Sequence, residues 1–306
     1  MAGRKPKSGR AAGLPLLRWA AEQSPDALMI TDAHGTIEYV NPAFEALTGH
    51  RRRQLVGHTP ALLRSGAHDA GFYRHLWREI LAGREFRGIF VNRRKDGRLF
   101  HEEEIIRPVL GSSGRVTHFV CAGRDVSARV REIDRLKRAA THDALTRLPN
   151  RALFLDRLAQ AVRQAARRKE GLVVAIIDLD GFRAANNVFG HAAGDAVLQA
   201  VARRTRRCVR KVDTVARIGG DEFALLLPSV GRREAAAAVL DKVLSANAGP
   251  VRFDGKSIPV GISVGACLYP RHARSASALR KRADAAMYAA KRAGGNRYRF
   301  AGARAG

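Results

Sequence analysis

Two apolar segments of strand length, each next to acidic residues, constrain most strongly what the second half of this chain can fold into. The first is Leu172–Ile177, which Asp178 follows at once, and the second is Phe223–Leu227, which Asp221 and Glu222 precede. A short, fully apolar run predicts a strand that is covered on both faces. Helical patterns surround these strands, over residues 151–169, 194–212, 234–246 and 275–293. Strands between packed helices predict an α/β sandwich around a mostly antiparallel sheet.

The acidic residues beside these two strands indicate a metal site. Gly219 and Gly220 can supply the positive φ angles of a two-residue hairpin turn, which would place Asp221 and Glu222 at its tip. If this hairpin lies beside the strand that ends at Asp178, the carboxylates converge and repel each other unless a cation joins them. Hard oxygen ligands suit Mg²⁺, above all when a nucleoside triphosphate supplies the remaining oxygens. A solvated acidic loop is the alternative interpretation, and an apolar strand directly after the two acids makes it the weaker one.

The first half of the chain shows a different pattern, with short strands separated by turn signals. Expected strands cover residues 26–32, 36–40, 86–94, 98–110 and 117–126, with short helices near 42–49 and 71–81. Helices inserted in a five-stranded antiparallel sheet describe an α+β sensor module. The two halves together predict an α+β two-domain protein, which a length of 306 residues accommodates.

A polar, helix-forming stretch, residues 127–141, joins the two halves. About two heptads can be traced through it and the residue before it, at Val126, Val130, Ile133, Lys137 and Ala140, with Leu136 alongside. This is too short for an independent coiled coil, but it fits a parallel dimeric connector if the flanking domains also dimerise. A single amphipathic helix that packs back on its own domain is the alternative.

The chain is strongly basic, with 55 Lys and Arg against 28 Asp and Glu, a formal net charge of +27. Such an excess indicates polyanionic partners, or else an arginine-rich composition spread over solvated faces. No helix-turn-helix, zinc-finger or RNA-binding signature accompanies the charge, so we expect no nucleic-acid partner. Residues 1–19 are predicted to be a basic, disordered arm rather than a signal peptide, because Pro15 and Arg18 interrupt their apolar stretch.

The cysteine content and the apolar runs bear on location. Cys121, Cys208 and Cys267 form no CxxC pair and are too few for a disulfide framework. Unpaired cysteines are typical of a reduced, cytoplasmic protein. The longest apolar runs are far shorter than the roughly 18 residues that a membrane span needs. The sequence therefore predicts a cytoplasmic protein without a membrane span.

Residues 20–126 resemble the PAS family, on the motifs VNPAFEALTG at 40–49, NRRKDG at 92–97 and GRDVS at 123–127. Members of this family bind haem, flavin, small metabolites or nothing. The cysteine motif of the light-sensing flavin subgroup is absent, so we expect no photochemical adduct. His58, His68 and His75 lie where a haem ligand could sit, but a surface or hydrogen-bonded histidine is the favoured interpretation of each. The PAS cofactor is therefore left unknown.

Four motifs in the second half resemble the GGDEF family of diguanylate cyclases. They follow that family's order and spacing: HDALTRLPNR at 142–151, DLDGFRAANNVFGHAAGD at 178–195, RIGGDEF at 217–223 and ADAAMYAAKRAGGNR at 283–297. The resemblance implies that residues 142–306 form an α/β sandwich similar to the palm of nucleotide cyclases and polymerases. It also implies condensation of two GTP into cyclic di-GMP with release of two pyrophosphates.

The GGDEF resemblance assigns metal and catalytic roles at the acidic edge. Asp178 and Asp221, with the carbonyl of Leu179, would hold Mg²⁺, for which Mn²⁺ could substitute. Glu222 would bind a second ion or help to deprotonate the attacking 3′-hydroxyl. Which of Asp221 and Glu222 is the catalytic base stays open.

The resemblance also implies a set of nucleotide contacts. Gly219 and Gly220 leave room for the substrate, and the phosphates meet Phe182, Arg183 and Lys291. Guanine is read by Asn186 and Asp195, since a carboxylate accepts from N1–H and the exocyclic amine, which favours GTP over ATP. Arg210 and Asp213 form the RxxD pattern of the family's inhibitory product site, so feedback by cyclic di-GMP is expected.

Four positions depart from the family pattern. Asn187 stands where aspartate is commoner, Gly295 replaces an arginine, Arg183 replaces a lysine and Arg147 replaces a glycine. None of these changes removes a metal ligand, so they bear on the turnover rate more than on the type of reaction.

The resulting prediction is a Mg²⁺-dependent diguanylate cyclase that works as a homodimer, because one site holds one GTP and the product needs two. A signal at the PAS domain would reach the catalytic domain through residues 127–141. One alternative is a catalytically weak or silent GGDEF domain that acts as a receptor for cyclic di-GMP or GTP. A basic nucleic-acid binder is a second alternative, supported only by the net charge.

Overall fold

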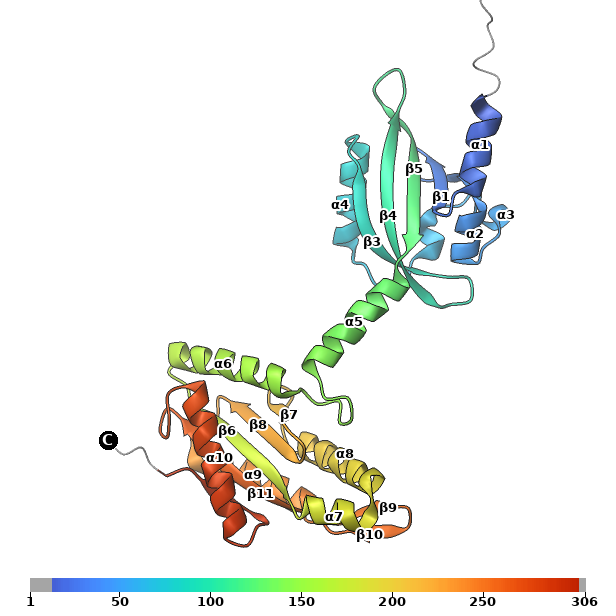
Figure 1. The fold of residues 1–306 in the computed structure, drawn as a ribbon. Coiled ribbons are helices and arrows are strands. Elements are labelled where there is room, and N and C mark those ends of the chain that lie inside the picture. The colour runs from blue at the N-terminus through green and yellow to red at the C-terminus, as the bar shows by residue number, and fades with distance from the viewer. Residues whose placement is uncertain (1–12, 303–306) are drawn as a thin grey trace, which may run out of the picture. The chain divides into compact units, whose positions relative to one another are not determined.

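The computed structural model describes residues 13–302 (Figure 1). The chain divides into two compact units, one reaching to Asp134 and the other starting at Arg135. We describe each unit by itself. No helix within residues 13–302 is long and apolar enough to cross a bilayer.

The N-terminal unit contains the five-stranded antiparallel sheet expected from the PAS resemblance, in the order β2-β1-β5-β4-β3. Its strands are β1 (Ala27–Asp32), β2 (Ile37–Val40), β3 (Phe86–Arg93), β4 (Leu99–Leu110) and β5 (Val116–Asp125). Its helices are α1 (Gly13–Gln23), α2 (Pro42–Thr48), α3 (Arg52–Leu55), the 3₁₀ helix η1 (Pro60–Leu63) and α4 (Ala70–Leu81). Residues of α2, α3, η1 and α4 share one buried apolar core with the inner face of the sheet.

Asn41 explains why the motif NPAFEALTG folds as it does. Its side-chain oxygen accepts from the backbone N–H of Phe44 and caps α2, while its amide nitrogen donates to two backbone carbonyls that precede β1. Pro42 occupies the first helical position, where a missing N–H costs nothing. Gly49, at φ 74°, ends the helix in the left-handed conformation that glycine adopts most easily.

The predicted disordered arm over residues 1–19 is wrong for the part that the structure describes. Residues from Gly13 onward form α1, and residues 1–12 lie outside the described range. Pro15 is no obstacle because it falls in the first turn of the helix, where no N–H is needed. Glu22, near the end of α1, accepts from the Tyr39 hydroxyl at 3.0 Å and so fixes the helix to β2.

The connector is the helix α5 (Ser127–Thr141), and its start is fixed to the sheet. The Asp125 carboxylate accepts from the backbone N–H of Ser127 at 2.8 Å and from the Arg94 guanidinium at 2.7 Å. Beyond this anchor, Ile133 is 41% exposed and Leu136 is 54% exposed. The earlier apolar positions are covered, since Val126 is buried and Val130 is half-buried, so the exposed apolar residues lie toward the end of α5.

The C-terminal unit is built on a second five-stranded sheet, in the order β12-β11-β6-β8-β7. Its strands are β6 (Leu172–Asp180), β7 (Thr214–Arg217), β8 (Glu222–Pro228), β11 (Gly261–Tyr269) and β12 (Arg297–Phe300), and the hairpin β9 (Val251–Phe253) and β10 (Lys256–Ile258) lies outside this sheet. Only β11 and β12 pair in parallel; the other neighbours in this sheet are antiparallel.

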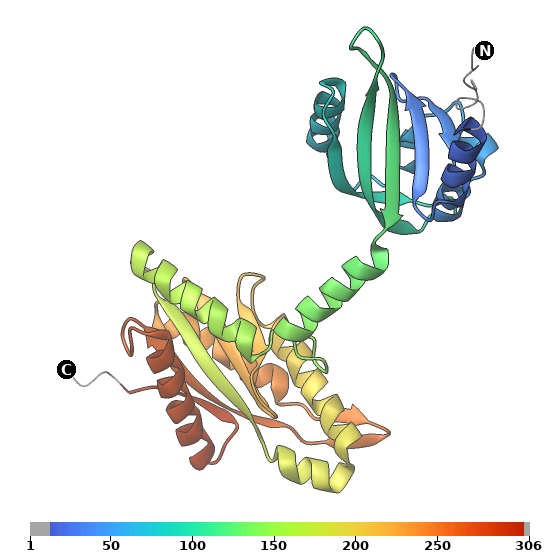
Figure 2. The same cartoon turned by 45° about the horizontal axis from the view of Figure 1, so that its top comes forward.

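Five helices complete this unit: α6 (Arg151–Arg168), α7 (Phe182–Phe189), α8 (His191–Arg207), α9 (Arg233–Asn247) and α10 (Ala276–Arg292). Alternate residues of β6 enter two different cores, Val173 and Ala175 with α8 and α9, and Val174 and Ile176 with α6 and α10. Two views show α6 and α10 on one side of the sheet and α8 on the other (Figure 1 and Figure 2). The predicted sandwich, with β6 buried on both faces, is confirmed.

Some element boundaries differ from the prediction. The helix expected over 194–212 ends at Arg207, because residues 210–213 turn back and Asp213 accepts from the N–H of Arg210. Strands β10 and β11 are separated at Pro259, which has no N–H to give to a ladder. The short helix α7 and the edge strand β12 were not predicted.

Candidate active site

The acidic edge lies where β6 and β8 run side by side. Asp178, the seventh residue of β6, lies opposite Glu222, the first residue of β8. The ladder between these strands stops at this pair, whereas β6 continues to pair with β11 as far as Asp180. Asp221 directly precedes β8 and lies close enough to act on the charges of both. The predicted convergence of these carboxylates is therefore present in the structure.

The electrostatics of this edge favour a cation. Burial raises the pKa of Asp178, which is 8% exposed; the Lys291 hydrogen bond opposes this rise and the charge of Asp221 adds to it. Burial also raises the pKa of Glu222, as do the charges of Asp284, Asp178 and Asp221. Each carboxyl group thus destabilises the ionised form of its neighbours, and a cation would relieve this repulsion.

Lys291 is the one cation that contacts this group of acids directly, among the contacts of residues 13–302. Its Nζ donates to Asp178 Oδ1 at 2.5 Å. Burial lowers the pKa of Lys291, but the hydrogen bond to Asp178 and the nearby carboxylates outweigh this and hold it above its usual value. Lys291 is therefore a charged ammonium at the site.

A groove of about 490 Å³ opens beside these residues. Asp178, Glu222 and Lys291 line it together with five further residues of α10, of which Lys281, Asp284 and Tyr288 carry polar groups. Sequence reasoning missed these three, although they recur with Lys291 at spacings of three and four residues, which place side chains on one helix face.

The turn before β8 does not have the predicted backbone conformation. Neither Gly219 nor Gly220 has a φ in the left-handed region, so the expected positive-φ turn is wrong. Instead, the N–H of Ile218 donates to the carbonyl of Glu222 at 2.9 Å and closes a wider turn. Gly219 leaves room for the Glu222 side chain, because a Cβ on Gly219 would lie 3.0 Å from the Glu222 carboxylate. Gly220 faces open space.

Arg217 and Asp143 hold this turn, and neither was predicted to be a site residue. The Arg217 guanidinium donates to the Gly220 carbonyl at 2.8 and 3.0 Å and to the Asp143 carboxylate at 3.1 Å. Asp143 also accepts from the backbone and hydroxyl of Thr146. The motif at 142–151 therefore positions the acidic turn. Two features of the sequence could have indicated these residues. Arg217 lies two residues before Gly219, and Asp143 is an aspartate in the motif at 142–151 to which no role had been assigned.

A second cluster joins α7 to α8. Asn186 Oδ1 is buried and lacks a hydrogen-bond partner within the described part of the chain. It lies against Gly194, where a Cβ would come within 1.8 Å of that oxygen. Asp195 is exposed in the first turns of α8, and Arg183 is exposed in the first turn of α7 after the half-buried Phe182. A buried acceptor without a donor is costly unless a ligand supplies one.

Comparison with known proteins identifies the families of the two domains. A family model described as "Diguanylate cyclase, GGDEF domain" matches residues 140–297, and one described as "PAS fold" matches residues 16–126. The chain belongs to the GGDEF diguanylate cyclase family. Its GGDEF domain follows a PAS domain, as the sequence motifs predicted.

Three relatives illustrate the match. Diguanylate cyclase TpbB from Pseudomonas aeruginosa (strain UCBPP-PA14) is 45% identical over 158 residues, which are 51% of this chain and 36% of the relative. An uncharacterized signaling protein from Caulobacter vibrioides is 34% identical over 300 residues, 94% of this chain and 35% of the relative. This chain thus spans about a third of the length of these curated relatives. A crystal structure of the coiled coil and GGDEF domain of DgcB from Caulobacter crescentus, in complex with cyclic di-GMP, has a TM-score of 0.52 and 30% identity, and the match covers 57% of this chain and 93% of that one.

Two departures from the GGDEF pattern have visible structural consequences. Gly295 has φ 67°, and a Cβ there would lie 2.7 Å from the Asp180 carboxylate. That carboxylate is fixed by Ser263 Oγ at 2.7 Å and by the N–H of Asn296 at 2.8 Å, so the loop is built around glycine. Arg147 has φ 61°, a left-handed conformation that suits the glycine commoner in the family.

Arg210 and Asp213, the RxxD pair of the GGDEF domain, contact each other. Asp213 is buried and accepts from the backbone N–H of Arg210 at 2.8 Å and from its guanidinium at 3.1 Å. The Arg210 side chain is exposed. In this structure Asp213 therefore orients an arginine at the surface.

Proposed function

We propose that this PAS–GGDEF chain is a diguanylate cyclase, which condenses two GTP into cyclic di-GMP and two pyrophosphates. The observation that carries the proposal is the edge of Asp178, Asp221 and Glu222 beside Lys291, open to the groove along α10. A phosphoryl-transfer site needs acids for a metal, a cation for the phosphates and room for the nucleotide. The relatives named as diguanylate cyclases support the reaction type.

The acidic edge fits Mg²⁺ or Mn²⁺ by its donor chemistry, since carboxylates that repel each other are hard oxygen ligands. Within residues 13–302 no three His, Cys, Asp or Glu side chains are already arranged as a complete metal cage. Triphosphate oxygens would therefore complete the coordination that Asp178, Asp221 and the Leu179 carbonyl begin, with Glu222 as a further ligand. The bound ion would neutralise phosphate charge and lower the pKa of the attacking hydroxyl.

The remaining roles belong to the chain's own side chains. Lys291 would exchange its contact with Asp178 for the substrate phosphates, joined by Arg183 and the N–H groups at the start of α7 near Phe182. Guanine would bring donors to the unpartnered Asn186 Oδ1 and to Asp195. Glu222 or Asp221 would accept the proton of the 3′-hydroxyl, while Gly219 and Gly220 leave space for the nucleotide.

The product requires two GTP-loaded domains that face each other, which a two-fold homodimer supplies. The exposed apolar residues of α5 are suited to pairing with a second copy, and the DgcB crystal structure contains a coiled coil together with the GGDEF domain. The PAS domain would control this pairing through the Asp125 anchor at the start of α5. The exposed Arg210, held by Asp213, would bind the phosphates of cyclic di-GMP and provide product inhibition. The three free cysteines and the need for GTP agree with a cytoplasmic location.

The assay is incubation of the purified full chain with GTP and Mg²⁺, with ATP as the matched nucleotide. Cyclic di-GMP and pyrophosphate are expected from GTP alone. Asp221→Asn should abolish both products, whereas the matched control Asp254→Asn, at the exposed turn between β9 and β10, should leave them unchanged. Saturable GTP binding without pyrophosphate release would instead establish the receptor alternative.

A further inference from the structure

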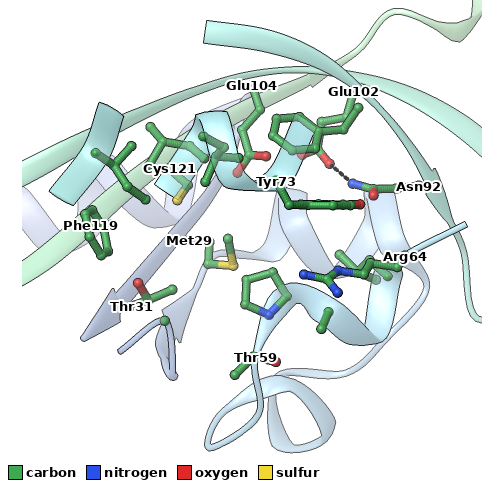
Figure 3. Close-up of a pocket in the computed structure, with 18 of the residues that line it drawn as sticks. Met29, Thr31, Thr59, Arg64, Tyr73, Asn92, Glu102, Glu104, Phe119 and Cys121 are labelled. Carbon is green, nitrogen blue, oxygen red and sulfur yellow. Dashed lines mark hydrogen bonds between the residues drawn. The ribbon is translucent and has the colours of Figure 1, made fainter. Parts of the chain in front are cut away.

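The PAS domain contains a cavity of about 200 Å³ between the inner face of its sheet and the helices η1 and α4 (Figure 3). Aromatic rings form much of its wall: Phe44, Tyr73, Trp77, Phe90 and Phe119. A dry cavity of about 150 Å³ holds benzene, so this one accommodates an apolar body of about eight to ten heavy atoms. Haem and flavin are far larger. His34 lines the cavity, whereas His58, His68 and His75 do not. His68 instead accepts from the N–H of Val91.

Two glutamates project into this apolar space from the middle of β4. Glu102 is 2% exposed and Glu104 is 7% exposed, and both line the cavity. They are two residues apart and so lie on the same face of the strand. The Glu102 carboxylate accepts from the Asn92 amide at 3.0 Å, while the hydrogen bond that Glu104 shares within the described residues is with the weakly polar Cys121 thiol. Figure 3 shows both carboxyl groups and Cys121 on the same wall of the cavity.

Gly123 indicates that the space for Glu102 is built into the sheet. A Cβ at this position of β5 would lie 2.0 Å from Glu102 Oε1. The neighbouring strand therefore carries no side chain where the carboxyl group lies. The absence of a side chain at Gly123 therefore provides the space in which the buried Glu102 carboxyl group lies.

Little positive charge surrounds Glu102 and Glu104. Arg94 acts on Glu102, but its guanidinium donates to Asp125 at 2.7 Å, and Asp125 itself opposes the ionisation of Glu102. Burial raises the pKa of Glu102 to about 7, and burial together with the charge of Glu102 raises the pKa of Glu104 well above its usual value. Arg64 is exposed at the cavity and stacks over the Tyr73 ring at 4.1 Å.

We propose that this cavity binds a small organic monocation, a primary ammonium or amidinium on an apolar body, with the charge at Glu104 and Glu102. Two buried carboxyl groups supply the hydrogen-bond acceptors, and the aromatic walls supply both apolar contact and cation–π attraction. A bare metal ion fits less well, because no group of three ligating side chains exists within residues 13–302 and the walls are apolar. The proposal does not depend on the catalytic activity of the GGDEF domain.

Tryptophan emission provides the measurement. The chain has two tryptophans, Trp19 and Trp77, both in the PAS unit, and Trp77 lines the cavity. In a Trp19→Phe background, the full chain is titrated with three probes of one carbon skeleton: phenethylammonium, 2-phenylethanol and phenylacetate. The ammonium is expected to bind saturably and at least about tenfold more tightly than the alcohol, as charge-assisted hydrogen bonds require.

Variants of β4 separate the charge from the fold. Glu104→Gln preserves shape and should weaken ammonium binding at least about tenfold, while alcohol binding changes by less than about twofold. Glu103→Gln is the matched control, since Glu103 lies between the two buried acids on the opposite face of β4 and does not line the cavity. If Glu104→Gln does not fold, Glu102→Gln is used instead, because it replaces the other buried carboxyl group with a neutral amide. Equal or tighter binding of the alcohol or the acid, an unchanged ammonium affinity in both Gln variants, or no ammonium binding below about 10 mM would overturn the proposal.

Discussion

The two domains of this chain both place carboxyl groups on a five-stranded sheet, but at opposite kinds of position. In the GGDEF domain, Asp178 and Glu222 lie where a strand ladder ends, beside an open groove, and Asp178 contacts Lys291. In the PAS domain, Glu102 and Glu104 lie in the middle of a strand and face a small cavity with aromatic walls. Acids at a strand end can meet a large charged substrate, whereas acids in mid-strand can meet only what fits inside. Position in the sheet thus separates a candidate metal-binding pair from a candidate sensing pair.

The largest expected effect tests whether cyclic di-GMP formation depends on the acids of the GGDEF sheet and not on those of the PAS cavity. Asp178→Asn removes a proposed metal ligand and the partner of Lys291, and should lower the rate of cyclic di-GMP formation by at least about 1000-fold. Glu102→Gln should leave the basal rate within about threefold, because its side chain lies in the PAS cavity. Steady-state assays of both variants, with circular dichroism as the check on folding, give the comparison. Comparable losses in the two variants would refute the division of roles.

The second effect concerns pH. The pKa of Glu102 in the folded state is about 7, above its ordinary value of 4.5, so the folded state binds more protons between these values. The stability associated with this group is therefore complete below about pH 4.5 and is lost as pH rises through 7, by about 3 kcal/mol. Urea unfolding followed by tryptophan emission, which reports on the PAS unit, should show this fall in the wild type and a smaller one in Glu102→Gln. If the free energies of unfolding of the wild type and Glu102→Gln change with pH in the same way, the folded protein does not hold Glu102 in its protonated form.

A smaller effect is expected at the guanine-reading cluster. Gly194→Ala places a methyl group against Asn186 Oδ1, so Asn186 must move and the KM for GTP should rise about tenfold with little change in kcat. Gly249→Ala is the matched control, because a Cβ there meets nothing within 4 Å. An unchanged KM in Gly194→Ala would remove Asn186 from the nucleotide site.

The smallest effect is on stability. Arg147→Gly should raise the free energy of unfolding of the GGDEF domain by up to about 1 kcal/mol, because the left-handed conformation at this position costs glycine little. The greater chain entropy of glycine in the unfolded state reduces this gain. Differential scanning calorimetry of the full chain would resolve it. A lower transition temperature for the GGDEF domain would mean that other contacts of Arg147 outweigh the strain.

The parts of the fold that sequence could predict are those set by local pattern. The apolar runs of β6 and β8 and the intervening helices follow from periodicity, and the convergence of Asp178 and Asp221 follows from placing the two strands side by side. The turn at Gly219 and Gly220 was predicted in the wrong conformation, because Arg217 and Asp143 shape it across a separation of 74 residues. No local rule reveals such a contact.

The acids of the PAS cavity show a second limit. Glu102, Glu103 and Glu104 are consecutive, and a run of three glutamates resembles a solvated face. Only the strand, with Phe100 and Ile106 buried on the same side, shows that the first and third of them point inward. Burial of a charged residue is a property of the neighbouring strands and helices, and Gly123 could be understood as making space only once β5 was placed beside β4.

The central claim is that the acidic edge joins two GTP molecules held by two copies of the GGDEF domain. The most direct measurement is the rate of cyclic di-GMP formation per protein chain as a function of protein concentration, with pyrophosphate counted in the same samples. We predict two pyrophosphates for each cyclic di-GMP and a rate per chain that rises with concentration until the dimer is saturated. Pyrophosphate release without a cyclic dinucleotide, or GTP that is bound and recovered intact at every concentration, would contradict the account.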